Sequence, residues 1–368
     1  MLSLCRQKRG LLLANCLLLL AMLFLTVLFH HSVSRQYSQM VAKRWENQEI
    51  PYHQISVFME KDEEQTASFL SGVRNSIQAS LQEAAYTDAS VPGRLWMDAY
   101  MTEGEDAVSK ISQTGQATVE HVPIMAVGGD FFLFHPVDLL FGSTFTEDDI
   151  NGDRVVIDEN LAWALYGAYD IAGKTVQIGE KQFVVAGVYR ASDAKEDETA
   201  RESACLYMSY DAFCSLYEGK GGISCYEAVI PNPVKDFALK AVKKAFGEDE
   251  DEQYDTAEKA VSFENRICVD NTQRFGVFRL YGKLFQLPKL VMRTNAIRFP
   301  TWENAVRMVE IRLSFLLWIR LFLLFLLILA DRRQIWWGMK WIGGKIKKLP
   351  GESKKWARYF WGKIASRR

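Results

Sequence analysis

Two long apolar runs stand out in the pattern of hydrophobic and polar residues. Residues 11–29 form nineteen consecutive positions without a charged side chain, and residues 313–330 form eighteen positions with one charge, Arg320. An α-helix rises about 1.5 Å per residue, so each run has roughly the length that crosses the ~30 Å hydrocarbon core of a bilayer. The pattern predicts two transmembrane helices.

The first run could instead be a cleaved signal peptide. It is longer than the ~7–15 apolar residues usual in such a peptide, and no Ala-X-Ala cleavage motif follows it. Residues 32–34, Ser-Val-Ser, are the only weak candidate for cleavage. We therefore favour a retained anchor, continued by a helical stalk over residues 33–50.

Strand and helix periods alternate in the part of the chain between the two runs. Residues 54–59 and 95–100 predict strands, and residues 64–83 predict a helix between them. One face of that helix carries the apolar positions Leu70, Val73, Ile77 and Leu81. A polar loop over residues 104–116 and a strand over residues 118–124 are expected next.

A second strand–helix–strand unit is predicted near the end of this region. Its strands are residues 226–230 and 261–263, and its helix follows Asn232 as N-cap and runs to residue 246. Before it, a strand over residues 205–208 leads into a short helix capped by Ser209.

Residues 141–189 predict a compact block between the two units. It contains a strand at 154–157 and a helix at 159–166, followed by strands at 175–178 and 182–185. Gly167 is placed to end the helix, and the pair Gly179-Glu180 suits a type II′ hairpin turn. The glycines expected to define turns of this block are Gly142, Gly167, Gly173, Gly179 and Gly187.

Charge is segregated along the chain, although the net charge is only −1. Residues 1–10 sum to +3, residues 331–368 to +10, and residues 11–330 to −14. Basic segments beside membrane spans stay in the cytoplasm. We therefore expect a cytoplasmic N-terminus (1–10), an extracytoplasmic domain (30–312) and a cytoplasmic tail (331–368). The fold class expected is an α+β extracytoplasmic domain, two β-α-β units plus an inserted mixed subdomain, flanked by two transmembrane helices.

The block at 141–189 carries a resemblance to a known family. The succession of Phe-Gly at 141–142, the acidic cluster at 145–149, and the segments 155–157, 160–162, 165–167, 171–174 and 184–188 resembles the MacB-like periplasmic core domain of ABC permeases of the MacB and FtsX kind. The resemblance implies a porter-like subdomain, a sabre-like insert, and motion driven by a separate cytoplasmic ATPase. That family usually places two more spans after the second. We therefore expect a permease subunit or permease-like partner, and the source of the two further spans stays open.

Arg320 and the tail are the candidate contact residues. A cation in the middle of a span costs about 2.5–3.5 kcal/mol on insertion scales, so Arg320 is expected to find a carboxylate on another helix, a lipid phosphate or a polar groove. The alternative is snorkelling to the interface. In the tail, aromatic and basic residues alternate, which favours an anionic membrane surface over nucleic acid. The tail residues considered as coupling or interfacial contacts are Trp336, Trp337, Trp341, Lys345, Lys347 and Lys348.

No motif for catalysis or for a cofactor occurs. The Gly-Lys-Thr at 173–175 lacks the first glycine of a P-loop, and no HExxH or GxSxG is present. No catalytic, metal or cofactor residue is therefore expected. Four cysteines in the exported region could form up to two disulfides, and the three possible connectivities stay open. They are Cys205, Cys214, Cys225 and Cys268.

The leading hypothesis is a permease subunit, or permease-like partner, of a MacB/FtsX-type ABC complex at the plasma membrane. Its expected partners are a separate ABC ATPase, another permease chain and membrane lipids, and an oligomer is a further option. The alternative is a non-transport extracytoplasmic sensor or assembly protein built on the same fold.

Overall fold

The computed structural model describes residues 2–45, 50–61, 66–86, 94–111, 117–146, 149, 152–190, 205–247, 254–255, 260–262, 266–291 and 297–347. The chain divides into two compact units. One comprises Met1–His31 and Phe315–Arg368, and the other comprises Ser32–Ser314.

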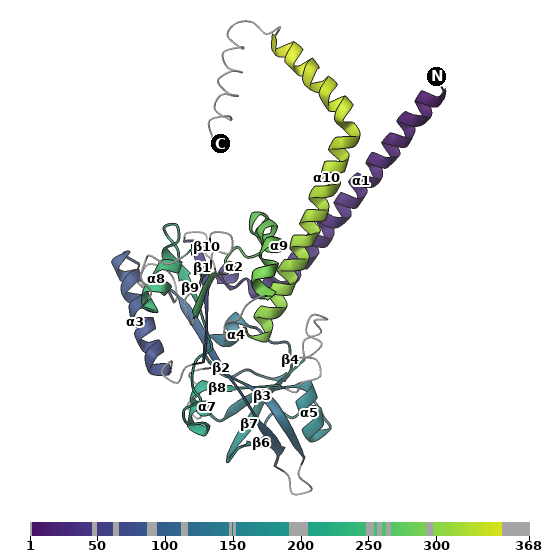
Figure 1. Cartoon of the computed structure of the whole chain (residues 1–368). Helices are drawn as coiled ribbons and strands as arrows, with labels where there is room; N and C mark the ends of the chain where they lie inside the picture. The colour runs from purple at the N-terminus through teal and green to yellow at the C-terminus, as the bar shows by residue number, and fades with distance from the viewer. Residues whose placement is uncertain are drawn as a thin grey trace. The chain divides into compact units, whose positions relative to one another are not determined.

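Two β-α-β units interlock at the centre of Ser32–Ser314 (Figure 1). Their elements are β1 (Tyr52–Met59), α3 (Ala67–Glu83), β2 (Met97–Lys110), β9 (Cys225–Pro231), α8 (Phe237–Ala245) and β12 (Arg266–Asp270). The strands lie in the order β12-β1-β9-β2, and every neighbouring pair is antiparallel. Each unit is therefore a split β-α-β, with a strand of the other unit inserted between its own two strands.

The inserted subdomain extends the same sheet beyond β2. Its elements are β3 (Thr118–Gly129), α4 (Phe131–Phe134), β4 (Leu139–Gly142), β5 (Arg154–Asp158), α5 (Glu159–Tyr166), β6 (Thr175–Ile178), β7 (Lys181–Tyr189), β8 (Leu206–Ser209) and α7 (Tyr210–Leu216). The order continues β2-β3-β8-β5-β7-β4, and β6 pairs with both β2 and β7. At the other edge, β10 (Tyr254–Asp255) and β11 (Ala260–Ser262) complete the sheet of twelve strands. The α+β fold with an inserted mixed subdomain is thus confirmed.

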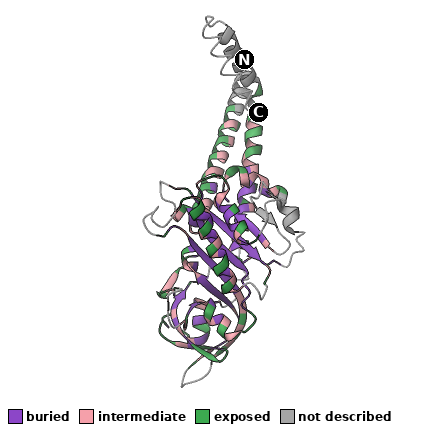
Figure 2. Cartoon of the chain, turned by 90° about the vertical axis from the view of Figure 1, so that its left-hand side faces the viewer, coloured by how far each residue is buried: buried purple, intermediate pink, exposed green. Residues whose placement is uncertain are grey.

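Three apolar cores hold these layers together. α3 and α8 cover one face of the four central strands, and the predicted stripe of α3, Leu70, Val73, Ile77 and Leu81, is at most 1% exposed. The opposite face packs against α2 (Val41–Trp45) and α4. The insert has its own core, in which Leu161 and Leu165 of α5 lie against the strands. Figure 2 shows the buried strands of both parts.

In the block at residues 141–189, the observed helix and turns agree closely with those predicted from the sequence. α5 spans the predicted residues, its N-cap Asp158 accepts a hydrogen bond from the Leu161 amide at 2.7 Å, and Gly167 follows with φ 66°. Gly179 opens the two-residue turn between β6 and β7 with φ 55°. Gly173 has φ 83° in the turn before β6, and Gly142 has φ 78° at the end of β4.

Gly187 does not lie in a turn, contrary to expectation. It lies inside β7, opposite Gly142 of β4, and its φ is not positive. A Cβ atom there would lie 2.6 Å from the main-chain oxygen of Ser143. Glycine is therefore suited to this position because two main chains approach closely.

Several predicted boundaries are wrong. β2 continues to Lys110 where a loop was expected, because it pairs with β3 and, from Val108, with β6. α8 begins at Phe237, after Asp236 in a left-handed conformation, although Asn232 still accepts a hydrogen bond from the Ala238 amide. Ser209 stands at the N-cap of α7 without a side-chain hydrogen bond.

Two further elements differ from the expected pattern. The stalk over residues 33–50 is not one helix, because α1 (Leu2–Arg35) gives way to η1 (Tyr37–Gln39) and then to α2. β12, which no pattern predicted, is a five-residue strand buried from Ile267 onward. A short central strand of this kind lacks the alternation that marks a half-exposed strand.

Two helices are long and apolar enough to cross a membrane, namely Leu12–Arg35 of α1 and Thr301–Ala330 of α10 (Thr301–Lys347). Most large apolar side chains of α1 in the first unit are exposed, with Leu13, Leu17 and Phe24 each more than 60% exposed. Apolar surface of that extent is typical of a helix solvated by lipid. No disulfide joins the described cysteines Cys205, Cys214, Cys225 and Cys268.

Candidate functional site: a buried ion cluster at the start of α10

Five charged side chains gather where α10 begins, within Ser32–Ser314. Arg274 lies in the turn after β12, Lys283 lies in α9 (Val277–Val291), and Glu303, Arg307 and Glu310 lie in the first three turns of α10. The side chains of Arg274, Glu303 and Glu310 are at most 4% exposed. Three cations therefore share two carboxylates away from water.

Arg274 is at the centre of this ion cluster. Its Nη1 and Nη2 donate to the two carboxylate oxygens of Glu303, each at 3.0 Å, and its Nε donates to Glu310 at 2.8 Å. Burial alone would lower the pKa of Arg274, but Glu303 and Glu310 raise it above its ordinary value. The guanidinium thus stays charged and bridges two positions of α10 that lie two turns apart.

The other two cations, Lys283 and Arg307, each pair with one of the two carboxylates. Lys283 Nζ lies 3.0 Å from Glu310, and Arg307 Nε donates to Glu303 at 2.7 Å. The Arg307 guanidinium also lies 3.9 Å from the ring centroid of Phe299, a cation–π contact. The ion cluster therefore joins three segments: the turn after β12, α9 and α10.

A second buried network reaches α10 through an aromatic ring. Glu227 of β9 accepts a hydrogen bond from Ser56 at 2.6 Å and pairs with His135 Nε2. Burial alone would raise the pKa of Glu227, but His135 and Ser56 lower it below its usual range. The His135 ring centroid lies 4.4 Å from that of Trp302 in α10. The first turns of α10 are therefore held to the middle of the sheet as well as to β12.

The ion cluster attaches the first turns of α10 firmly to the turn after β12. Removing one partner from a buried ion pair costs about 3–5 kcal/mol, so the first turns of α10 resist separation from the turn after β12. Within the described residues, no group of three or more His, Cys, Asp or Glu side chains could hold a metal ion.

The residues singled out from the sequence lie elsewhere. Arg320 is half-buried in α10, and no described residue forms a hydrogen bond or ion pair with it. The main chain of α10 continues through Trp336, Trp337, Trp341, Lys345 and Lys347, whose side chains are not described, and Lys348 lies outside the described residues.

Sequence reasoning missed the ion cluster, although one signal was available. Glu303, Val306, Glu310 and Leu313 follow one another at i, i+3, i+7 and i+10, so two acidic residues lie in the stripe that continues as the buried face of α10. Acidic side chains in an apolar stripe need partners. Arg274 and Lys283 are not identifiable as those partners without the fold.

Comparison with known proteins identifies the family. The model of the MacB-like periplasmic core domain matches residues 20–228, more than half of the chain. The chain belongs to the MacB-like periplasmic core domain family. The match ends within β9, so the ion cluster of this MacB-family protein lies outside the matched region.

Solved structures of similar proteins include three domains. The periplasmic region of MacB from Actinobacillus actinomycetemcomitans is 16% identical, with 59% of this chain and 88% of that chain covered and a TM-score of 0.39. The extracellular domain of the noncanonic ABC-type transporter YknZ from Gram-positive bacteria is 14% identical (54% and 96% covered, TM-score 0.34). A domain of a putative permease from Porphyromonas gingivalis is 14% identical (70% and 96%, TM-score 0.31). A search of curated proteins finds no match.

Family membership gives the general role. Proteins of this family are components of ABC transporter permeases. This MacB-family chain is accordingly a permease-type component, and its two apolar helices flanking a periplasmic-type domain fit a two-pass membrane protein.

Proposed function

We propose that this chain transmits conformational change between a cytoplasmic ABC ATPase and its own extracytoplasmic domain. The observation that carries the proposal is the ion cluster, in which Arg274 binds Glu303 and Glu310 of α10. α10 continues from the ion cluster into an apolar run. A displacement of α10 is therefore suited to be transmitted through the ion cluster to β12 and α9. A flexible linker at the same place would absorb that displacement.

The proposed topology has both ends in the cytoplasm. Arg6, Lys8 and Arg9 precede the first apolar run, and Arg332 and Arg333 begin the basic tail after the second. Residues 11–29 and 313–330 are then the spans, and residues 30–312 are extracytoplasmic. The acidic sum of residues 11–330 agrees with this orientation.

The proposed partners are a separate ABC ATPase and a second permease chain, with lipids bound by the tail. The tail supports this because its six candidate contacts, Trp336, Trp337, Trp341, Lys345, Lys347 and Lys348, combine aromatic rings with positive charge. Arg320, placed in the middle of an apolar run, supports a partner within the membrane.

Co-purification tests the assignment. The full chain, tagged at the N-terminus, is extracted from native membranes in mild detergent, and the proteins recovered with it are identified by mass spectrometry. An ABC ATPase and a multispanning permease are expected. Recovery of neither, with a cell-wall enzyme instead, would overturn the transport role in favour of a sensor or assembly protein.

A further inference from the structure

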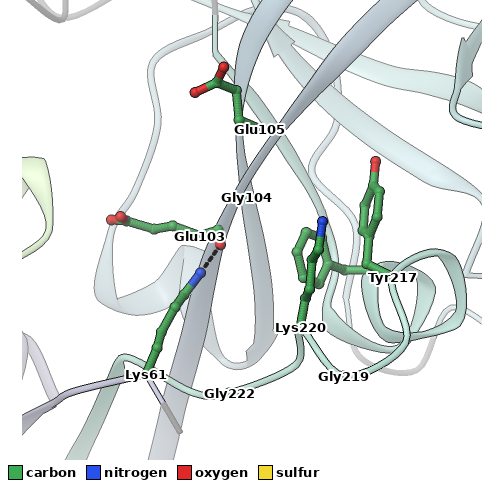
Figure 3. Close-up of a pocket in the computed structure, with 9 residues that line it drawn as sticks. Lys61, Glu103, Gly104, Glu105, Tyr217, Gly219, Lys220 and Gly222 are labelled. Carbon is green, nitrogen blue, oxygen red and sulfur yellow. Dashed lines mark hydrogen bonds between the residues drawn. The ribbon is translucent and has the colours of Figure 1, made fainter. Parts of the chain in front are cut away.

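The cavity beside Gly104 in β2 carries its own counter-charges (Figure 3). It measures about 480 Å³, and its lining holds two lysines, Lys61 and Lys220, and two glutamates, Glu103 and Glu105. Lys61 Nζ donates to the main-chain oxygen of Glu103. The charges of the lining balance, so this cavity selects no ligand. The surface that calls for a partner lies on α9.

An aromatic face of α9 is exposed, although the helix belongs to the folded unit Ser32–Ser314. The aromatic face consists of Val277, Phe278 and Phe285, of which Phe278 is 93% exposed and Phe285 is 70% exposed. The two phenylalanines are seven residues apart in one helix, so they lie on the same side of it. Large apolar side chains gathered on one exposed face indicate contact with a partner.

The polarity of α9 is reversed relative to that of a helix on a water-exposed surface. Lys283 is buried in the ion cluster, and Arg279 donates to the main-chain oxygen of Asp270. Among the described side chains of α9, the two cations therefore bind to the protein, whereas two phenylalanines are exposed. A surface helix in water carries its charged residues on the outer face. The reversal favours an apolar environment outside α9.

The ion cluster fixes α9 at the level where α10 enters its apolar run. Lys283, which lies between the two phenylalanines in sequence, places its Nζ 3.0 Å from Glu310. The apolar run begins at Leu313, about 4.5 Å further along the helix axis. The headgroup layer on each side of the hydrocarbon core is about 5–8 Å thick. A span that begins at Leu313 therefore puts Glu310, and α9 with it, at the level of the headgroups.

We propose that α9 is an interfacial helix whose aromatic face lies in the extracytoplasmic leaflet of the lipid bilayer. Phenylalanine is among the side chains that such helices bury at the boundary of headgroups and acyl chains. The pair of Lys283 and Glu310 joins this lipid contact to the start of the span. The proposal rests on the two-pass topology proposed above, and it does not depend on an ATPase partner.

Photo-crosslinking to lipid tests the contact. The full chain carries p-benzoyl-phenylalanine in place of Phe278 or Phe285, and it is reconstituted into vesicles of phosphatidylglycerol and radiolabelled phosphatidylethanolamine. The same replacement at Phe322, exposed in the apolar run, is the positive control, and at Trp163, exposed in α5 of the insert, the negative control. Because burial of a phenylalanine favours the lipid-bound state by about tenfold or more, labelling at Phe278 and Phe285 should exceed that at Trp163 by at least about tenfold.

The controls separate failure of this proposal from failure of the topology. No labelling at Phe322 would overturn the two-pass topology and the proposal with it. Labelling at Phe322 with only the Trp163 level at Phe278 would overturn the interfacial position of α9 alone. A covalent dimer in place of the lipid adduct would assign the aromatic face to a second copy of the chain. An adduct with another protein in native membranes would assign it to a partner subunit, and either result overturns the lipid contact.

Discussion

Arg274 donates from both terminal nitrogens to the carboxylate of Glu303, 29 residues further along the chain, and both side chains are 4% exposed. The pair connects the turn after β12 to the first turn of α10. Neither charge can return to water without opening this junction. Loss of one partner therefore leaves the other buried without compensation.

Replacing Arg274 by methionine should accordingly destabilise the domain by about 3–5 kcal/mol, because Glu303 and Glu310 lose their shared cation. The measurement is denaturant-induced unfolding of the full chain in detergent micelles. The control is Arg94→Met, which removes an ion pair to Asp130 whose arginine is 60% exposed, and should cost less than about 1 kcal/mol. Similar losses in both variants would show that the ion cluster does not hold the junction.

Asp158 predicts a pH dependence of stability within the insert. Burial raises the pKa of Asp158 to about 6, although the Leu161 amide donates to its carboxylate. Because the folded pKa lies above the unfolded value, this contribution to stability is complete below about pH 4 and is lost as the pH rises through about 6. The shift corresponds to about 3 kcal/mol.

The variant Asp158→Asn tests this, since asparagine keeps an oxygen acceptor for the helix N-terminus but does not titrate. Unfolding midpoints measured from pH 4 to pH 7.5 should decline less in the variant than in the wild type. Parallel curves would mean that Asp158 has an ordinary pKa in the folded protein.

The sequence predicted the elements whose local signals agree with the fold. α5 was predicted residue by residue, because Gly167 follows a short amphipathic run, and the stripe of α3 was predicted from its spacing. The outer half of β2 was missed because its largely polar residues carry no strand pattern, although they pair with β3 and β6. β12 was missed because its strand character comes from β1, which is distant in the chain. The ion cluster was missed because Arg274 and Glu303 are brought into contact by the arrangement of the sheet, α9 and α10, which local sequence patterns do not show.

Gly187→Ala should destabilise the insert by about 1–3 kcal/mol through overpacking, because the added Cβ would lie 2.6 Å from the Ser143 main-chain oxygen. The matched control is Gly72→Ala in α3, where no atom lies within 4 Å of the added Cβ. There the gain in helix propensity should stabilise by about 0.5–1 kcal/mol. Thermal unfolding of both variants gives the sign of each change, and stabilisation by Gly187→Ala would refute the close approach of β4 and β7.

Arg320→Leu should weaken association with a second membrane chain if a carboxylate of that chain pairs with the arginine. The measurement is the amount of multispanning partner recovered with the tagged chain, relative to Arg332→Leu, which alters a basic residue after the apolar run. Undiminished recovery with Arg320→Leu would favour snorkelling to the interface. If the partner is recovered at the wild-type level with Arg320→Lys but not with Arg320→Gln, the effect is due to the positive charge.

Deletion of residues 334–368 should separate coupling from folding. The deletion removes the tail residues Trp336, Trp337 and Trp341 with their neighbouring lysines and leaves Ser32–Ser314 intact. We expect the truncated chain to unfold at the wild-type denaturant midpoint while its partner ATPase loses stimulation in proteoliposomes. A variant with Lys345, Lys347 and Lys348 replaced by glutamine should show a partial loss that is largest at low ionic strength, because charge near an anionic surface contributes about 1 kcal/mol per residue and salt screens that contribution. Full stimulation by the truncated chain would exclude the tail as the coupling segment. The ion cluster at Arg274 would then have to transmit motion through the part of α10 before residue 334.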